Sequence, residues 1–95
     1  MAAYLIVDVE VNDAAAYEAY RSHAPALIAA HGGRYLVRGG AVERLEGQWQ
    51  PHRMALLEFP SLDALRAFYA DPAYQGLMAL RVRAATSQVL AVEGL

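Results

Sequence analysis

The strictest pattern in the sequence lies in its first dozen residues. From Tyr4 to Val11 apolar side chains alternate with a mixed set, which predicts a β-strand. One face of this strand is entirely apolar and must be covered by the rest of the chain. The opposite face carries both apolar and charged residues, namely Tyr4, Ile6, Asp8 and Glu10.

Apolar residues then recur at helical spacing and predict a helix from about Asp13 to His31, with Asn12 or Asp13 as its cap and Gly32 as its left-handed stop. Because Pro25 removes one backbone hydrogen bond, the pattern predicts either a kink there or two consecutive helices.

A second helical region begins at Pro60-Ser61, with the Ser61 hydroxyl as its cap. Asp71-Pro72 restarts it, since proline is well tolerated in a first helical turn, and the renewed helix is expected to run to about Ala85.

Further strands are predicted from short alternating or apolar runs. They are expected at Arg34 to Arg38, Val42 to Glu46, His52 to Phe59 and Ser87 to Val92. Gly39-Gly40 is either a two-residue hairpin turn or a bulge in one bent strand. The sequence leaves both geometries open.

This order of elements predicts a single α+β domain over residues 1–95, a ferredoxin-like split β-α-β fold with an antiparallel sheet and helices on one face. The other face, expected to carry Leu36 and Arg38 beside Asp8, is too apolar for water and too charged for a dry core. We therefore expect a second copy of the chain to cover it, giving a homodimer.

Composition narrows the function. A net charge of −2 argues against nucleic-acid binding, and the basic residues are all arginine, which excludes lysine Schiff-base chemistry. The chain has no cysteine, so thiol nucleophiles and thiolate metal sites are absent. Asp8 and Glu10 interrupt the first apolar run too early for a signal peptide or membrane span, which predicts a cytoplasmic protein.

The candidate catalytic residues are Arg38, Glu58, Asp8 and His23. A guanidinium on the apolar side of a sheet needs a carboxylate, and Asp8 or Glu58 is the expected partner. The pair either fixes the dimer register or faces a pocket, where the acid would act as a base. His23 is an alternative base, whereas the spacing of the histidines does not predict a metal site.

Aromatic residues are the other candidates for a binding site. Tyr20, Tyr69 and Tyr74 fall at helical spacing, which is typical of core packing but also allows them to line an apolar pocket. Trp49 lies in a polar loop and is expected to contact either the ligand or the partner subunit.

The segments "RYLVRGG", "LEGQWQP", "LEFPS" and "FYADPAYQ" together resemble a bacterial family of unknown function, DUF1330, in the dimeric α+β barrel superfamily. The resemblance covers nearly the whole chain. It implies an uncharacterised homodimer within a superfamily that includes cofactor-free monooxygenases, lactone isomerases and haem-dependent enzymes. The matching positions are Arg38, Gly39, Gly40, Trp49, Pro51, Arg53, Glu58, Tyr69 and Tyr74.

The sequence thus predicts a homodimer that binds a small apolar or aromatic molecule between sheet and helices, without cofactor or metal, and leaves catalysis undecided. The alternative is a non-catalytic structural or regulatory homodimer. A pocket larger than about 300 Å³ that holds Arg38 with an acid or a histidine would favour the first hypothesis.

Overall fold

The computed structural model describes residues 1–95 and contains four strands and three helices. In chain order they are β1 (Ala3–Val11), α1 (Ala14–Ala30), β2 (Arg34–Arg38), β3 (Met54–Phe59), α2 (Leu62–Ala70), α3 (Pro72–Ala84) and β4 (Ala85–Glu93). None of the helices has the length and hydrophobicity needed to cross a membrane.

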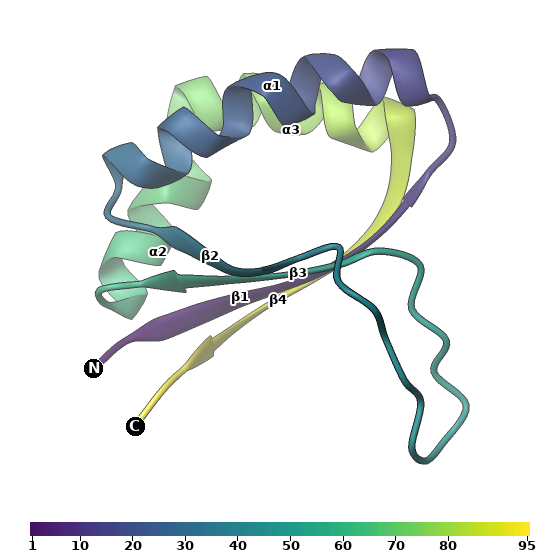
Figure 1. Cartoon of the computed structure of the whole chain (residues 1–95). Coiled ribbons are helices and arrows are strands. Elements are labelled where there is room, and N and C mark those ends of the chain that lie inside the picture. The colour runs from purple at the N-terminus through teal and green to yellow at the C-terminus, as the bar shows by residue number, and fades with distance from the viewer.

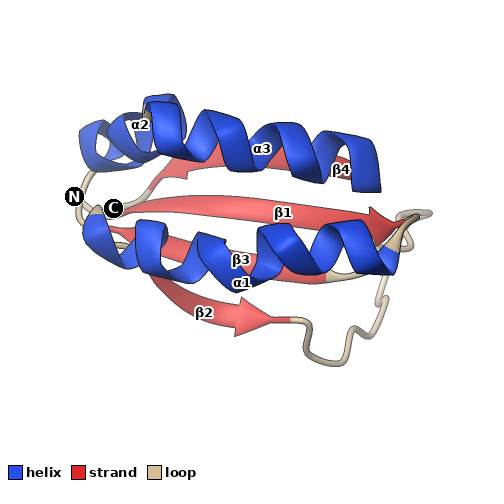
Figure 2. Cartoon of the chain, turned by 90° about the horizontal axis from the view of Figure 1, so that it is seen from above, coloured by secondary structure: helices blue, strands red, loops and turns tan.

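The strands form one antiparallel sheet in the order β2-β3-β1-β4. All three helices cover the same side of it, and the opposite side is left open (Figure 1). Seen from above, α1 and α3 run next to each other along the sheet, with α2 beyond one end of α3 (Figure 2). The predicted ferredoxin-like α+β fold is confirmed.

Short polar side chains begin each helix by accepting a hydrogen bond from an exposed backbone amide. Asp13 caps α1, Ser61 caps α2 and Asp71 caps α3. Helix α1 continues through Pro25, so the alternative of two consecutive helices is wrong. Gly32 follows with a φ of 78°, the left-handed conformation predicted for the helix stop.

Asp71 also joins α1 to the start of α3. Its carboxylate lies 2.9 Å from Nε2 of His31, just beyond the end of α1. The hydrogen bond with His31, followed by the one from the Ala73 amide, lowers the pKa of Asp71 below its usual range. A single side chain therefore caps one helix and ties it to another.

Strand β2 departs from the predicted alternation. Tyr35 pairs with Leu57 and Val37 with Leu56, so Leu36 is an extra residue, a β-bulge within the strand. Beyond the bulge Arg38 lies opposite Ala55, on the side of the sheet that the helices cover. The expectation that Arg38 shares the open face with Asp8 is therefore wrong.

Gly39 ends β2 with a φ of 71°, and the chain then forms a loop of residues 39–53. The predicted strand from Val42 to Glu46 is not present. Neither geometry foreseen for Gly39-Gly40 occurs as described, because the bulge comes three residues earlier and no hairpin follows. A Cβ at Gly39 would stand 3.1 Å from Nε of Arg53, so glycine here also leaves room for that arginine.

The core lies between the sheet and the helices and is rich in aromatic rings. Phe59 and Phe68 are fully buried, with their ring centroids 5.2 Å apart. Phe68 in turn lies 4.3 Å from the ring of Tyr74. These contacts hold α2 and α3 against the sheet, since aromatic side chains bury large areas and pack well in tilted pairs.

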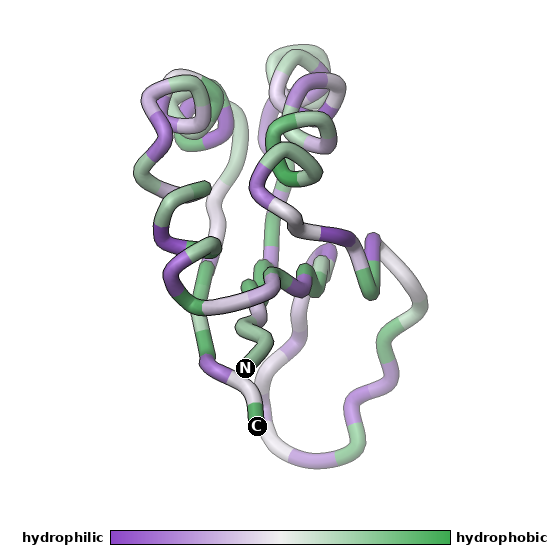
Figure 3. Tube along the Cα trace, turned by 90° about the vertical axis from the view of Figure 1, so that its left-hand side faces the viewer, coloured by the Kyte–Doolittle hydropathy of each residue, from purple (hydrophilic) through white to green (hydrophobic).

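The open face of the sheet carries apolar side chains in contact with solvent. Leu90 is 67% exposed and Val92 48% exposed on β4, and Leu36 and Val37 are exposed on β2. The 39–53 loop hangs on this same side (Figure 1), and hydrophobic residues interrupt its hydrophilic stretches (Figure 3). Its exposed large apolar residues are Val42, Leu45 and Trp49.

Candidate functional site

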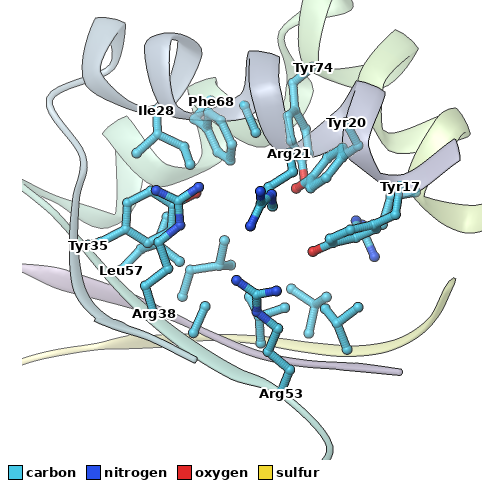
Figure 4. A pocket seen from close by; sticks show the side chains of 17 residues that line it. Tyr17, Tyr20, Arg21, Ile28, Tyr35, Arg38, Arg53, Leu57, Phe68 and Tyr74 are labelled. Atoms are coloured by element: carbon cyan, nitrogen blue, oxygen red, sulfur yellow. The ribbon is translucent and has the colours of Figure 1, made fainter. Parts of the chain in front are cut away.

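A cavity of about 60 Å³ lies between the sheet and the helices, and 17 residues line it, 13 of them hydrophobic. Strands β1 and β3 form its floor, and α1 and α3 form its roof (Figure 4). The four remaining lining residues are all arginines, namely Arg21, Arg38, Arg53 and Arg81.

The arginines reach the cavity from four parts of the chain. Arg21 comes from α1 and Arg81 from α3, while Arg38 ends β2 and Arg53 precedes β3. Figure 4 shows Arg38 and Arg53 rising from the sheet toward Arg21, which points down from the helix. Because Arg21 and Arg38 are exposed and Arg81 is buried, the charges extend from the mouth of the cavity into its depth.

These charges lack the partners that buried ions normally have. The lining contains no aspartate, glutamate or histidine. Arg21 pairs with Glu18 at 3.0 Å, but no carboxylate lies within 4.0 Å of Arg38, Arg53 or Arg81. Three of the four guanidiniums are therefore not neutralised by this chain.

Arg81 is the extreme case, because it is only 5% exposed. Its guanidinium reaches only phenols: Nη2 donates a long hydrogen bond of 3.5 Å to the hydroxyl of Tyr69, and the side chain of Tyr74 is a second hydrogen-bonding neighbour. Its guanidinium carbon also lies 5.8 Å from the ring centroid of Tyr20, a distance compatible with a cation–π contact. Removing an ion from water costs several kcal/mol, which these neutral neighbours offset only in part.

Tyrosines supply the polar atoms beside the arginines. The hydroxyls of Tyr20 and Tyr74 are 2.9 Å apart and form a hydrogen bond. Burial, followed by the neighbouring Tyr74, raises the pKa of Tyr20 well above its usual value. Burial likewise raises the pKa of Tyr35, whose ring lies 4.7 Å from the guanidinium carbon of Arg38. Both phenols therefore stay neutral at pH 7.

The acids expected to pair with Arg38 are engaged elsewhere. Glu58 faces the open side and binds Arg34, with 2.8 Å between Nη2 and Oε1. Asp8 is buried beneath the 39–53 loop and accepts hydrogen bonds from the backbone amides of His52 and Arg53 at 2.9 and 3.3 Å. The predicted ion pair of Arg38 with Asp8 or Glu58 is therefore wrong.

The other candidates divide between the cavity and the surface. Tyr20, Tyr74 and Arg38 line the cavity. His23 is exposed on α1, where Nδ1 lies 2.8 Å from the carbonyl oxygen of Ala19. Trp49 lies on the open side and donates to Asp8 at 3.3 Å.

Tyr69 lines a second, shallower hollow of about 550 Å³ beside α2 and β4. The two hollows adjoin, since Leu5 and Val89 line both. The hydroxyl of Tyr69 connects them, because it accepts the hydrogen bond from Arg81.

Sequence reasoning did not select Arg21, Arg53, Arg81 or Tyr35 as site residues, yet all four line the cavity. Arg81 could have been found, because it continues the inward-facing helical spacing of Tyr74, Leu77 and Met78. The position of Arg53 depends on contacts that local spacing does not reveal.

The cavity meets only part of the criteria that would favour ligand binding, which are a volume above about 300 Å³ and the presence of Arg38 with an acid or a histidine. Its volume of about 60 Å³ is well below the roughly 300 Å³ of typical ligand pockets. It contains Arg38, but no acid or histidine accompanies it. No group of three potential metal-ligating side chains occurs in the chain.

Comparison with solved structures supports the fold. A protein of unknown function from Rhodopseudomonas palustris matches with a TM-score of 0.77 and 22% identity, over 99% of this chain and 82% of that one. A dimeric ferredoxin-like protein of unknown function from a Jannaschia species matches with a TM-score of 0.66 and 18% identity, over 99% and 100% of the chains.

SnoaB, a cofactor-independent oxygenase from Streptomyces nogalater, matches with a TM-score of 0.67 and 16% identity, over 99% of this chain and 93% of that one. At such identities the likeness establishes a shared fold alone. No curated protein shows significant sequence similarity to the chain. A family model matches residues 2–95, and the chain therefore belongs to DUF1330, a domain of unknown function.

Proposed function

We propose that this chain forms a homodimer and that each protomer binds a small molecule in the cavity between sheet and helices, without a cofactor. The observation that carries the proposal is the set of cavity arginines that no carboxylate of the chain neutralises, namely Arg38, Arg53 and Arg81. Burying the charge of Arg81 in an apolar cavity is costly for folding alone, and buried charges of this kind are concentrated at functional sites.

Dimerisation would take place through the open face of the sheet. This face exposes Leu36, Val37, Leu90 and Val92, which a second copy could cover by packing sheet against sheet. The 39–53 loop projects on the same side and would extend along the partner (Figure 1). Two proteins of similar fold, from Jannaschia and Bacteroides fragilis, are described as dimeric.

The finer form of the proposal is cofactor-independent chemistry of the monooxygenase or isomerase kind. SnoaB, which has a similar fold, is described as a cofactor-independent oxygenase. The cavity lacks a carboxylate or imidazole base, so its contribution would be electrostatic. Fixed guanidiniums would stabilise the enolate or phenolate of a ligand that releases its proton to solvent water, as preorganised charges do in other active sites.

The second candidate is a non-catalytic structural or regulatory homodimer. The small cavity volume, about 60 Å³, favours this alternative because it leaves little space for a substrate of ordinary size. Under this hypothesis the arginines would be held only by neutral tyrosines.

Native mass spectrometry of freshly purified protein tests the proposal. We expect a species with twice the chain mass of 10.3 kDa, carrying additional mass that is lost when the protein is denatured. A bare monomer would contradict the proposal, whereas a dimer that never carries or takes up a small molecule would support the non-catalytic alternative.

A further inference from the structure

We propose that the ligand of this cavity is a small monocarboxylic acid, bound as its anion by Arg81 and Arg53 with its apolar part against the tyrosine rings. This inference rests on the proposed function, because it assigns a chemical class to the ligand of the same cavity. It replaces the neutral apolar or aromatic molecule that the sequence predicts.

The first argument is the missing negative charge. Arg81 is only 5% exposed. It lines the cavity and has no carboxylate within 4.0 Å. A guanidinium offers five N–H donors, and the groups that this one meets are phenols, with a long hydrogen bond of 3.5 Å to Tyr69 and Tyr74 beside it. An anion in the cavity would supply both the acceptors and the charge.

The neighbouring phenols do not fill this role. Tyr20 and Tyr74 already share a hydrogen bond of 2.9 Å, and burial holds the pKa of Tyr20 above its usual value. Tyr20 is therefore not a tyrosinate counter-ion at neutral pH. The lining also has no acid that could move to meet Arg81.

The second argument is the type of anion. Guanidinium groups bind carboxylate and phosphate in a similar forked geometry. The lining favours carboxylate, because 13 of its 17 residues are hydrophobic and would leave a phosphate dianion poorly solvated. The volume of about 60 Å³, roughly the share of two water molecules, admits a carboxylate head, and the apolar part has to be small or extend toward the mouth.

The third argument is the gradation of exposure along the arginines. Arg38 and Arg21 are exposed at the mouth, Arg53 is half-buried and Arg81 is buried. A diffusing anion meets positive charge first at the mouth and then at increasing depth, where its attraction to the arginines is less screened. Arg53 and Arg81 should therefore dominate affinity, and Arg38 the rate of entry.

Titration of the intact protein with propionate and benzoate tests the assignment, with propionamide and benzamide as uncharged analogues and phosphate as the competing anion. Binding is followed by two-dimensional NMR at pH 7 and constant ionic strength, where the arginine Nε–Hε signals report on the site. We expect saturable shifts with at least one carboxylate in the millimolar range or tighter, and at least tenfold weaker binding of the matching amide and of phosphate.

The variants Arg53→Gln and Arg81→Gln should each weaken carboxylate binding at least tenfold. Arg83→Gln is the matched control, since Arg83 lies on the same helix as Arg81, is exposed and lines neither hollow. It should bind as the wild type does. Arg81→Gln should also leave the melting temperature of the ligand-free protein unchanged or higher, which a merely structural arginine would not do.

Two results would overturn the assignment in different ways. If the amides or phosphate bind as tightly as the carboxylates, or Arg53→Gln binds carboxylate as well as Arg83→Gln does, the cavity binds a ligand of another class and the proposed function survives. If no probe binds and native mass spectrometry finds no retained molecule, the proposed function fails as well.

Discussion

The two faces of the sheet differ in how their charged side chains are paired. On the open face Asp8, Glu58 and Glu10 each have a partner within the chain. Asp8 accepts hydrogen bonds from amides of the 39–53 loop, Glu58 pairs with Arg34, and Glu10 lies 3.3 Å from His52. The cavity on the helix-covered face is lined by arginines and no acids. The difference teaches that the open-face charges are balanced within the chain, whereas Arg38, Arg53 and Arg81 have no carboxylate of the chain within 4.0 Å.

The largest expected effect concerns the open face as an interface. Leu90→Arg should raise the dimer dissociation constant at least 100-fold, about 2.7 kcal/mol, because two-fold symmetry places the buried charge in the interface twice. Sedimentation velocity over a range of protein concentrations measures it. Val82→Arg is the control, since Val82 on α3 is 65% exposed, much as Leu90 is at 67%, but lies away from the sheet. Equal dimerisation of both variants would refute the interface.

The next effect tests whether the open-face carboxylates are structural. Asp8→Ala should lower the free energy of unfolding by about 2 kcal/mol, because it leaves partly buried amide donors of the 39–53 loop unsatisfied. Urea denaturation at a fixed protein concentration measures the loss. Asp8→Asn keeps one acceptor oxygen and should lose roughly half as much. A loss below about 1 kcal/mol for Asp8→Ala would remove the contrast between the faces.

A smaller effect is expected at the cavity tyrosines. Tyr20→Phe should cost about 1 kcal/mol at pH 8 through loss of the hydrogen bond to Tyr74. Because burial raises the pKa of folded Tyr20 above the unfolded value of about 10, the stability that it contributes is present below pH 10 and lost above it.

Urea denaturation at pH 8 and pH 11 should accordingly show a steeper loss for the wild type than for Tyr20→Phe. Tyr4→Phe serves as control, because Tyr4 pairs with Glu58 on the open face and its hydroxyl has no hydrogen bond within the chain. If both variants lose stability as the wild type does, the hydroxyl of Tyr20 is not the group responsible.

The smallest effect separates paired from unpaired arginines. Arg34→Gln removes an exposed ion pair with Glu58 and should lower the free energy of unfolding by up to about 1 kcal/mol. Arg38→Gln should leave it unchanged within about 0.5 kcal/mol or raise it, because it removes a charge close to other guanidiniums. Side-by-side urea denaturation of the ligand-free proteins distinguishes the two, and a larger loss for Arg38→Gln would show that Arg38 is structural.

Local patterns were sufficient to predict most of the fold. The alternation in β1 and the capping by Ser61 and Asp71 are interactions between residues that are close in the sequence. Such interactions determine where this strand and these helices form, so the sequence alone reveals them. The segment from Val42 to Glu46 shows the limit of such patterns. It alternates as a strand does, but a strand forms only where another supplies its hydrogen bonds, and none does here.

The site was harder to predict than the fold because its residues come together through tertiary contacts. Arg53 and Arg38 enter the cavity from the sheet, and Arg81 enters from a helix more than 25 positions beyond Arg53 in the chain. The rule that buried charges are paired pointed to Asp8 and Glu58 as partners of Arg38. That rule did not apply to Arg38, which is exposed and has no carboxylate within 4.0 Å.

The extra residue in β2 decides on which side of the sheet Arg38 lies. If β2 paired regularly with Leu36 retained, Leu36 would stand opposite Leu56 and Arg38 opposite Met54, and the side chain of Arg38 would turn toward the open side, because successive strand residues face opposite ways. A slip of one residue would thus withdraw a cation from the cavity entrance and insert it among the apolar groups outside. Relatives of the same length that lack the bulge are therefore expected to differ in selectivity and in assembly at once.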